Sequence, residues 1–375
     1  MRMTSRPAIT LSFTAIGMLL LAGVTMLAPF IGCADDETST PLDAIVVPDD
    51  FPTPQAAVDA APAGQLILVR PGTYLGSEVR VLSAGGDSVR ASLFMKEGVR
   101  VLGQGGTGLA VLRDTTGLDG SVGVVFDSLG SGTMLENLVF EDHDIGALVV
   151  GQSGQLISNR FAAARVGILV KLAGQPYLIG NLVEEADSVG ILNEQSDGAY
   201  GANLVRGCEV GMAAESAGLP IYDSNILCRN RIGFLARRGA TPLMRGNVMR
   251  SNSWLGALFQ SGAVPDFKEN DLYWNGGADL AVANYQPHLD TPLPAKGNYW
   301  GGEYSVEEIG LSRILDALDD ASRGATVDCT PVSPIFFYDP SGALNAACAA
   351  RSAAELAAIT RALAGVSGRL DRFSH

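Results

Sequence analysis

The sequence predicts an all-β protein, a single-stranded right-handed parallel β-helix whose three sheets wind in coils of about 22 residues. Two recurring residues lead to this prediction. Asparagine recurs at successive spacings of 22, 22, 22, 22, 22 and 23 residues, at Asn137, Asn159, Asn181, Asn203, Asn225, Asn247 and Asn270. A glycine follows each of the first six asparagines, at Gly146, Gly167, Gly190, Gly211, Gly233 and Gly256.

The coil length favours strands over helices. A repeat of 22 residues is too short for two helices but suits three short strands, with neighbouring coils about 4.8 Å apart. We expect each asparagine to face inward at a turn, where its amide can bond the adjacent coil and satisfy backbone groups that water cannot reach. We expect each glycine to supply the positive φ at the next corner.

Three successive positions after each glycine are apolar in nearly every coil. Because side chains alternate across a strand, the middle residue faces opposite to its neighbours. If it faces outward, it forms an apolar stripe longer than a soluble monomer normally exposes. The residues of this leucine stripe are Leu148, Leu169, Leu192, Leu235 and Leu258.

The N-terminal sequence predicts an export signal. Arg2 and Arg6 precede an apolar run over residues 11–31 and the sequence Phe30-Ile31-Gly32-Cys33, which resembles a lipoprotein signal peptide. The resemblance implies lipidation of Cys33 and a bacterial envelope location, at the outer membrane or cell surface rather than the inner membrane. An uncleaved membrane anchor and ordinary secretion remain as alternatives.

Four segments follow from these patterns. Residues 1–32 are the predicted signal peptide, and residues 33–43 form a flexible tether. Residues 44–335 form the β-helix, and residues 336–375 form a helical tail that packs on or caps it. The net charge of −14 argues against nucleic acid as a partner, because phosphate backbones are bound by clustered lysine and arginine.

Three stretches resemble known β-helix families. Residues 54–74, PQAAVDAAPAGQLILVRPGTY, look like the opening of pectin-lyase-like proteins, in which a short helix caps the first coil. The coil at residues 225–235 and the closing Gly297-Asn298-Tyr299-Trp300-Gly301 resemble periplasmic copper-maturation and carbohydrate-processing β-helix proteins. The resemblance implies the fold and leaves function open, since the fold hosts lyases, hydrolases, esterases, epimerases and binding proteins.

The catalytic motifs of pectin esterases, polygalacturonases and pectate lyases are missing from the sequence. Glu141-Asp142-His143-Asp144 partly resembles the Asp-Pro-His-Asp motif of alginate C5-epimerases, with matches at His143 and Asp144. Six residues after each asparagine, a column runs through His143, Arg165, Asp187, Glu209, Arg231 and Ser253. His143 could act there as a base with Arg165 neutralising a uronate, but charged turns are also an ordinary solenoid surface.

No cofactor or metal site is predicted, because the chain has three histidines and no Cys-x-x-Cys pair. Beyond Cys33, an even number of cysteines invites pairing in an oxidising compartment. The register places Cys208 and Cys228 too far apart, so the favoured disulfide joins Cys329 to Cys348.

Two helices are expected near the C-terminus. The first spans residues 305–321, with Ser305 as N-cap and Glu308 completing a capping box. The second carries an apolar stripe at helical spacing and is expected to cover the leucine stripe of the solenoid. Its residues are Leu356, Ile359, Leu363, Val366 and Leu370.

Three functions remain open. The first is an envelope lipoprotein whose solenoid binds polysaccharide or another envelope component without catalysis. The second is a lyase, epimerase or hydrolase that acts on acidic glycans through an unrecognised site. The third is a scaffold or metal-maturation accessory protein.

Overall fold

The computed structural model describes residues 43–334, except 106–107, 115–118, 153, 286–289 and 303, together with Cys348. The chain divides into two units, Met1–Leu42 and Asp43–His375, and every described residue belongs to the second. The signal peptide, the tether and the helical tail apart from Cys348 therefore lie outside the described residues. No helix of the described residues is long and apolar enough to cross a membrane.

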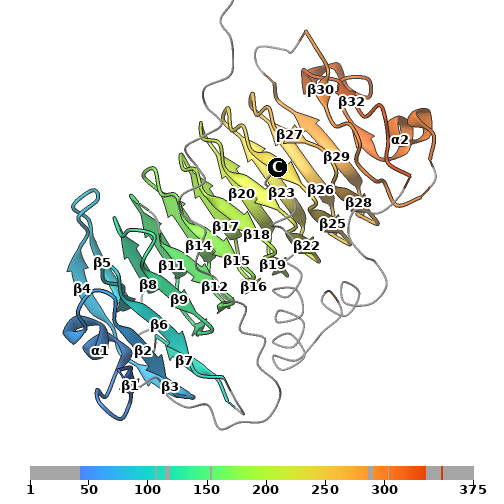
Figure 1. Cartoon of the computed structure of the whole chain (residues 1–375). Coiled ribbons are helices and arrows are strands. Elements are labelled where there is room, and N and C mark those ends of the chain that lie inside the picture. The colour runs from blue at the N-terminus through green and yellow to red at the C-terminus, as the bar shows by residue number, and fades with distance from the viewer. Residues whose placement is uncertain are drawn as a thin grey trace, which may run out of the picture. The chain divides into compact units, whose positions relative to one another are not determined.

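The described chain winds through three long sheets, which we call A, B and C, and these run the length of the solenoid (Figure 1). Sheet A contains β1 (Ile45–Val47), β2 (Leu66–Val69), β6 (Arg100–Gly103), β9 (Met134–Glu136), β12 (Gln155–Ile157), β15 (Tyr177–Ile179), β18 (Ala199–Gly201), β21 (Ile221–Asp223), β24 (Leu243–Arg245) and β27 (Asp266–Phe267). Sheet B contains β3 (Gly72–Leu75), β7 (Ala110–Arg113), β10 (Val139–Glu141), β13 (Arg160–Ala162), β16 (Leu182–Glu184), β19 (Leu204–Arg206), β22 (Ile226–Cys228), β25 (Val248–Arg250) and β28 (Asp271–Tyr273).

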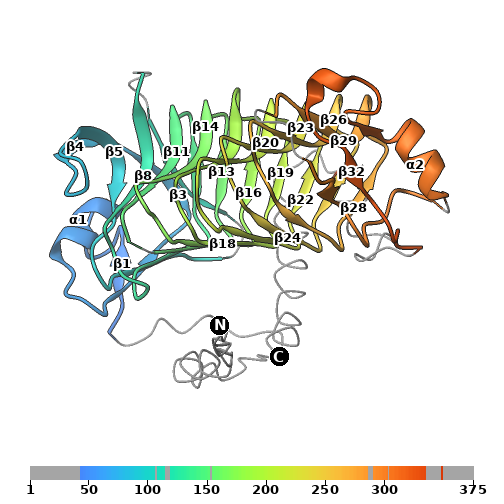
Figure 2. The same cartoon turned by 90° about the horizontal axis from the view of Figure 1, so that it is seen from above.

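Sheet C contains β4 (Glu78–Val81), β5 (Ser88–Phe94), β8 (Ser121–Asp127), β11 (Ile145–Val150), β14 (Val166–Lys171), β17 (Val189–Glu194), β20 (Val210–Glu215), β23 (Ile232–Arg237), β26 (Leu255–Gln260), β29 (Ala278–Ala283) and β31 (Ile314–Leu315). The strands β30 (Leu293–Pro294) and β32 (Val327–Asp328) form a small fourth sheet. Neighbouring strands are parallel except β4 and β5, which are antiparallel. The predicted right-handed parallel β-helix is confirmed, and Figure 2 shows the solenoid from above.

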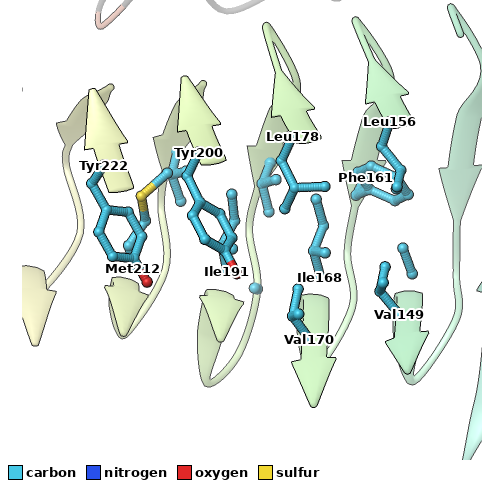
Figure 3. Close-up of a cluster of buried hydrophobic side chains, with 14 of the residues drawn as sticks. Val149, Leu156, Phe161, Ile168, Val170, Leu178, Ile191, Tyr200, Met212 and Tyr222 are labelled. Atoms are coloured by element: carbon cyan, nitrogen blue, oxygen red, sulfur yellow. The ribbon is translucent and has the colours of Figure 1, made fainter. Parts of the chain in front are cut away.

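The core fills the inside of the coils with stacked side chains of the same kind. Tyr200 and Tyr222 stack with ring centroids 4.7 Å apart, and Phe140 stacks on Phe161 at 5.3 Å. Figure 3 shows Tyr200 and Tyr222 beside Ile191 and Met212 in this interior. The leucine stripe lies on the outer face of sheet C, because its neighbours Ala147 and Val149 belong to the interior cluster and Leu148 does not.

A ladder of asparagines runs along the turn between sheets A and B. Nδ2 of Asn203 donates to Oδ1 of Asn225 at 2.9 Å and to the carbonyl of Leu178 at 2.8 Å, and Asn203 is fully buried. The same bonding links all rungs, which are Asn159, Asn181, Asn203, Asn225, Asn247, Asn270 and Asn298. The ladder thus pairs the buried turn amides of successive coils.

Asn137 is not a rung of this ladder, which corrects the prediction. Val139 pairs with Arg160, so this coil is one residue shorter and Leu138 takes the inward position. The Leu138 amide donates to Oδ1 of Asn159 at 3.1 Å, while Asn137 instead donates to the carbonyl of Gly103 at 2.7 Å.

The expected positive φ at the recurring glycines is also wrong. None of the six has a positive φ; the residue just before each asparagine rung has it instead, as at Ser158 with φ 52° and Ala202 with φ 51°. The glycines are required by close approach of neighbouring coils. A Cβ added to Gly211 would lie 2.6 Å from the carbonyl oxygen of Gly233, closer than carbon and oxygen can pack.

Helices close both ends of the solenoid. The α1 helix (Pro54–Ala60) begins at the N-cap Thr53, whose hydroxyl accepts from the Ala56 amide at 3.2 Å. The α2 helix (Val306–Ser312) has the predicted capping box of Ser305 and Glu308. It ends nine residues before the predicted end at 321, because Ile314–Leu315 pairs with β29 as a strand. A short 3₁₀ helix, η1 (Ala321–Arg323), follows.

The cysteine pairing differs from the prediction. Cys348 is bonded to Cys228 across 120 residues with Cα atoms 6.2 Å apart, whereas Cys329 and Cys208 are free and buried. Cys228 ends β22 with its side chain on the outer face of sheet B, where a distant segment can reach it.

Candidate functional site

The turn between sheets B and C carries a column of charged side chains on its outer surface. Nε of Arg165 lies 2.8 Å from Oδ1 of Asp144, and its second nitrogen bonds the other carboxylate oxygen at 3.0 Å. In the next coil Ser188, not the predicted Asp187, is in register with Arg165, because the Ser188 amide donates to the Arg165 carbonyl at 3.0 Å; Asp187 is exposed one residue before it. Arg231 pairs with Glu209 farther along. We call these charged residues along the turn, Asp144, Arg165, Asp187, Glu209 and Arg231, the edge column.

His143 lies on the inside of this turn and is not part of the edge column. Its side chain is 3 % exposed, and Nε2 lies 2.9 Å from the Ser92 hydroxyl. Asp144 occupies the predicted place beside Arg165, because the short coil at β13 shifts the register by one residue. Burial lowers the pKa of His143 to about 4 despite the nearby Asp114 and Asp142 carboxylates.

The edge column ends in two exposed tryptophans that the sequence reasoning missed. Trp254 continues the column after Arg231, since its amide donates to the Arg231 carbonyl at 3.0 Å. The Arg231 guanidinium lies over the indole of Trp254, 4.6 Å from the ring centroid. Trp254 is 41 % exposed and Trp274, in the next coil, is 64 % exposed.

The two tryptophans flank one turn of the solenoid. Trp274 begins the turn, and Gly277 ends it against the ring of Trp254, where an added Cβ would lie 2.8 Å from Cδ1. Trp274 has a positive φ of 58°, a conformation that bulky residues rarely adopt. The same turn position has a positive φ in preceding coils, at Arg229 with φ 58° and Ser251 with φ 52°, so the backbone of the fold sets this conformation and Trp274 is turned toward water.

A second set of charges adjoins the edge column on the outer face of sheet B. Nη1 of Arg160 lies 2.8 Å from Glu141, its Nε lies 2.6 Å from Glu184, and Arg206 reaches Glu184 at 2.7 Å. Arg113 pairs with both Glu141 and Asp142. Glu141 and Glu184 are thus each held between two guanidinium groups of neighbouring coils.

This arrangement is suited to binding more than to proton transfer. Hydrogen bonds from Arg165 lower the pKa of the Asp144 carboxyl, which keeps it ionised and a poor general acid. The histidine nearest the column is buried and faces inward. Among the described residues, no cluster of three or more histidine, cysteine or carboxylate side chains could hold a metal ion.

Nothing in the repeat spacing pointed to the tryptophans. The coil that contains Trp254 has one residue more before β26 than its predecessor, so the column counted from the asparagines reaches Ser253 instead. The usable signal was composition, because the chain has three tryptophans and two of them, Trp254 and Trp274, fall in neighbouring coils.

The strand order identifies the fold. The chain passes in turn through three long sheets, and an asparagine ladder stacks at the turn between sheets A and B. The described chain has a three-sheet parallel β-helix fold. No protein-family model and no curated protein matches this β-helix.

Three solved structures show weak similarity to this chain. Pectate lyase Pel9A is 15% identical over 80% of this chain and 75% of its own, with a TM-score of 0.45. DFA-IIIase from Arthrobacter chlorophenolicus A6 is 12% identical over 76% and 86%, with a TM-score of 0.39. ORF18 of Geobacillus virus E2 is 13% identical over 66% and 54%, with a TM-score of 0.35. Similarities at this level carry no argument about activity.

Proposed function

We propose that this protein binds polysaccharide without cleaving it, and that the binding surface is the edge column together with Trp254 and Trp274. The observation that carries the proposal is the pair of exposed tryptophans, 41 % and 64 % accessible, on neighbouring coils. The flat face of an indole stacks on the apolar face of a sugar ring, and a large ring with few rotatable bonds loses little entropy on binding.

The neighbouring charges supply the polar half of such a surface. Arg231 offers a planar set of donors beside the Trp254 ring, and Glu209 and Asp187 offer acceptors for sugar hydroxyls. The net charge of −14 repels polyanions at long range. A neutral polysaccharide is therefore the proposed ligand class.

Titration calorimetry with a soluble neutral β-glucan, and with polygalacturonate as the acidic comparison, tests the proposal. We expect the neutral glucan to bind the wild-type protein and the Trp254→Ala/Trp274→Ala variant to lose most of this affinity. Tyr177→Ala is the matched control, because Tyr177 is a 47 % exposed aromatic on the outer face of sheet A.

Three results would contradict the proposal. Equal affinity of the tryptophan variant and the wild type would place binding elsewhere. Release of new reducing ends or unsaturated products during incubation would favour the enzyme alternative, and preferential binding of polygalacturonate would remove the neutral-ligand class.

We also propose that Cys33 carries a lipid that holds the solenoid at the bacterial envelope. This rests on the signal-like sequence that precedes Cys33. The proposed binding surface is a row of exposed side chains along the solenoid. A lipid-anchored solenoid with such a surface could hold a polysaccharide chain at the cell surface.

A further inference from the structure

The outer face of sheet B bears an apolar column that is shielded from solvent. Its residues are Leu182, Leu204, Ile226 and Val248, which are 3 %, 1 %, 1 % and 0 % exposed. They face outward, because Val183, Val205 and Leu227, the middle residues of the same strands, belong to the interior cluster. We call these four residues the sheet B column.

Sheet A provides an internal comparison for this burial. Tyr177 and Ile221 occupy the same kind of position, the first residue of a three-residue strand with its side chain outward, and each is 47 % exposed. On sheet A, stacking within a column does not by itself bury such side chains. Another segment must cover the sheet B column.

Cys348 identifies the covering segment. It is bonded to Cys228 on this face, is itself 4 % exposed, and shares one apolar cluster with Leu204, Ile226 and Val248. Cys348 is helical, and residues 349–375 follow it in the sequence.

The sequence after Cys348 continues the same helical face. At about 100° per residue, Ile359 lies about 20° from Cys348 around the helix axis, Leu363 about 60° and Val366 about 0°. A helix that presents Cys348 to sheet B therefore presents the apolar stripe of the tail to sheet B as well. Residues 349–375 also hold four arginines and two carboxylates, a positive excess within a chain of net charge −14.

We propose that residues 349–375 form a helical strap along the sheet B column, fixed at its start by the Cys228–Cys348 disulfide. The occupant of this face is the chain's own C-terminus, and the strap belongs on sheet B instead of the leucine stripe of sheet C. A glycan at the edge column then meets sheet B already covered, so its contacts are limited to the edge between sheets B and C.

Hydroxyl-radical footprinting of the intact oxidised chain, read by mass spectrometry, tests the strap. We expect Leu204 and Ile226 to be labelled several-fold less than Ile221 on sheet A. In the Ile359→Asp/Leu363→Asp variant, we expect labelling of Leu204 and Ile226 to rise toward that of Ile221. Ala354→Asp, on the opposite face of the predicted helix, is the matched control and is expected to leave the pattern unchanged.

Labelling of Leu204 and Ile226 as strong as that of Ile221 in the wild type would overturn the proposal, as would no increase in the double variant. If the double variant unfolds, the interior residue Val183 will also be labelled, and the footprint of that variant can no longer test the strap. Tryptic cleavage of the wild type then tests the strap without a substitution. A docked strap protects the bond after Arg361 until the disulfide is reduced, whereas cleavage at equal rates before and after reduction contradicts the strap.

Discussion

The hydroxyl of Ser92 lies 2.9 Å from Nε2 of His143, and both side chains are buried although 51 residues separate them in the sequence. Nδ1 of the same imidazole is buried and has no hydrogen-bond partner. The imidazole thus fills the corner between sheets B and C in its neutral form. This placement separates His143 from the edge column, so the imidazole cannot act there as the predicted base.

The buried imidazole should make stability fall in mild acid. Burial lowers the pKa of His143 from 6.5 to about 4, so the unfolded chain takes up this proton first as the pH falls. The stabilisation by the neutral imidazole is fully present above pH 6.5. It is lost as the pH falls from 6.5 to 4, and the total loss is about 3 kcal/mol at about 1.4 kcal/mol per pH unit. Urea unfolding of the wild type and His143→Gln from pH 7.5 to 4 should show the steeper loss in the wild type; parallel curves would contradict this.

Each rung of the asparagine ladder should contribute more stability than Asn137, which has the repeat spacing but is half-buried outside the ladder. Asn203→Ala leaves the Leu178 carbonyl and the Asn181 amide without their buried partners, which should lower the free energy of unfolding by about 1–3 kcal/mol. Asn137→Gly is the control, because Asn137 has the repeat spacing but is not a rung. Denaturant midpoints measure both, and equal losses would mean that the ladder adds nothing.

The recurring glycines should tolerate no side chain. The Cβ of Gly211→Ala would approach the Gly233 carbonyl at 2.6 Å and Nδ2 of Asn230 at 2.8 Å, forcing two coils apart at a cost of about 1–3 kcal/mol. Gly201→Ala is matched to it, because the nearest atom to its new Cβ would be 3.9 Å away. Thermal unfolding of both variants should separate them; similar melting temperatures would show that the coils can relax.

The fold could be predicted because the sequence repeats with the period of a coil, and each rung repeats the same hydrogen bonds. Errors arose where one coil gained or lost a residue. Because Val139 pairs with Arg160, Asn137 is not in register with the ladder and His143 is not in register with the edge column. Because the coil before β26 is one residue longer, counting from the asparagines reaches Ser253 and misses Trp254. Such insertions leave the composition unchanged, so only strand register reveals them.

The disulfide could not be predicted for a different reason. Pairing depends on which face of the sheet a cysteine occupies and on where a distant segment returns. Cys228 and Cys348 are 120 residues apart, and no repeat relates them. Proximity in sequence favoured Cys329, which the fold instead buries in the interior cluster.

Lipidation should depend on one residue of the N-terminal sequence. We expect cells that express the full chain to incorporate labelled palmitate into the protein, and Cys33→Ala to abolish the incorporation and the globomycin-sensitive processing. Cys208→Ala is the control, because Cys208 is buried in the solenoid. Undiminished labelling of Cys33→Ala would contradict the lipoprotein proposal.

Replacing Trp274 by glycine should lower glucan affinity while changing stability little. Its φ of 58° is a left-handed conformation, which costs an ordinary residue about 1–2 kcal/mol, and Gly207 holds the equivalent turn position with φ 70°. Trp274→Gly relieves that strain but loses the edge contact with Tyr273, whose ring centroid is 5.0 Å away, a pair worth about 0.5–1.5 kcal/mol. The two changes oppose each other, so stability should stay within about 1 kcal/mol of the wild type while glucan affinity falls. Ser251→Gly, at the same turn position one coil earlier with φ 52°, should leave affinity unchanged. Calorimetry measures the glucan affinity and denaturant unfolding measures the stability on the same samples. If Trp274→Gly has the expected stability but binds the glucan as tightly as the wild type, Trp274 is not part of the binding surface.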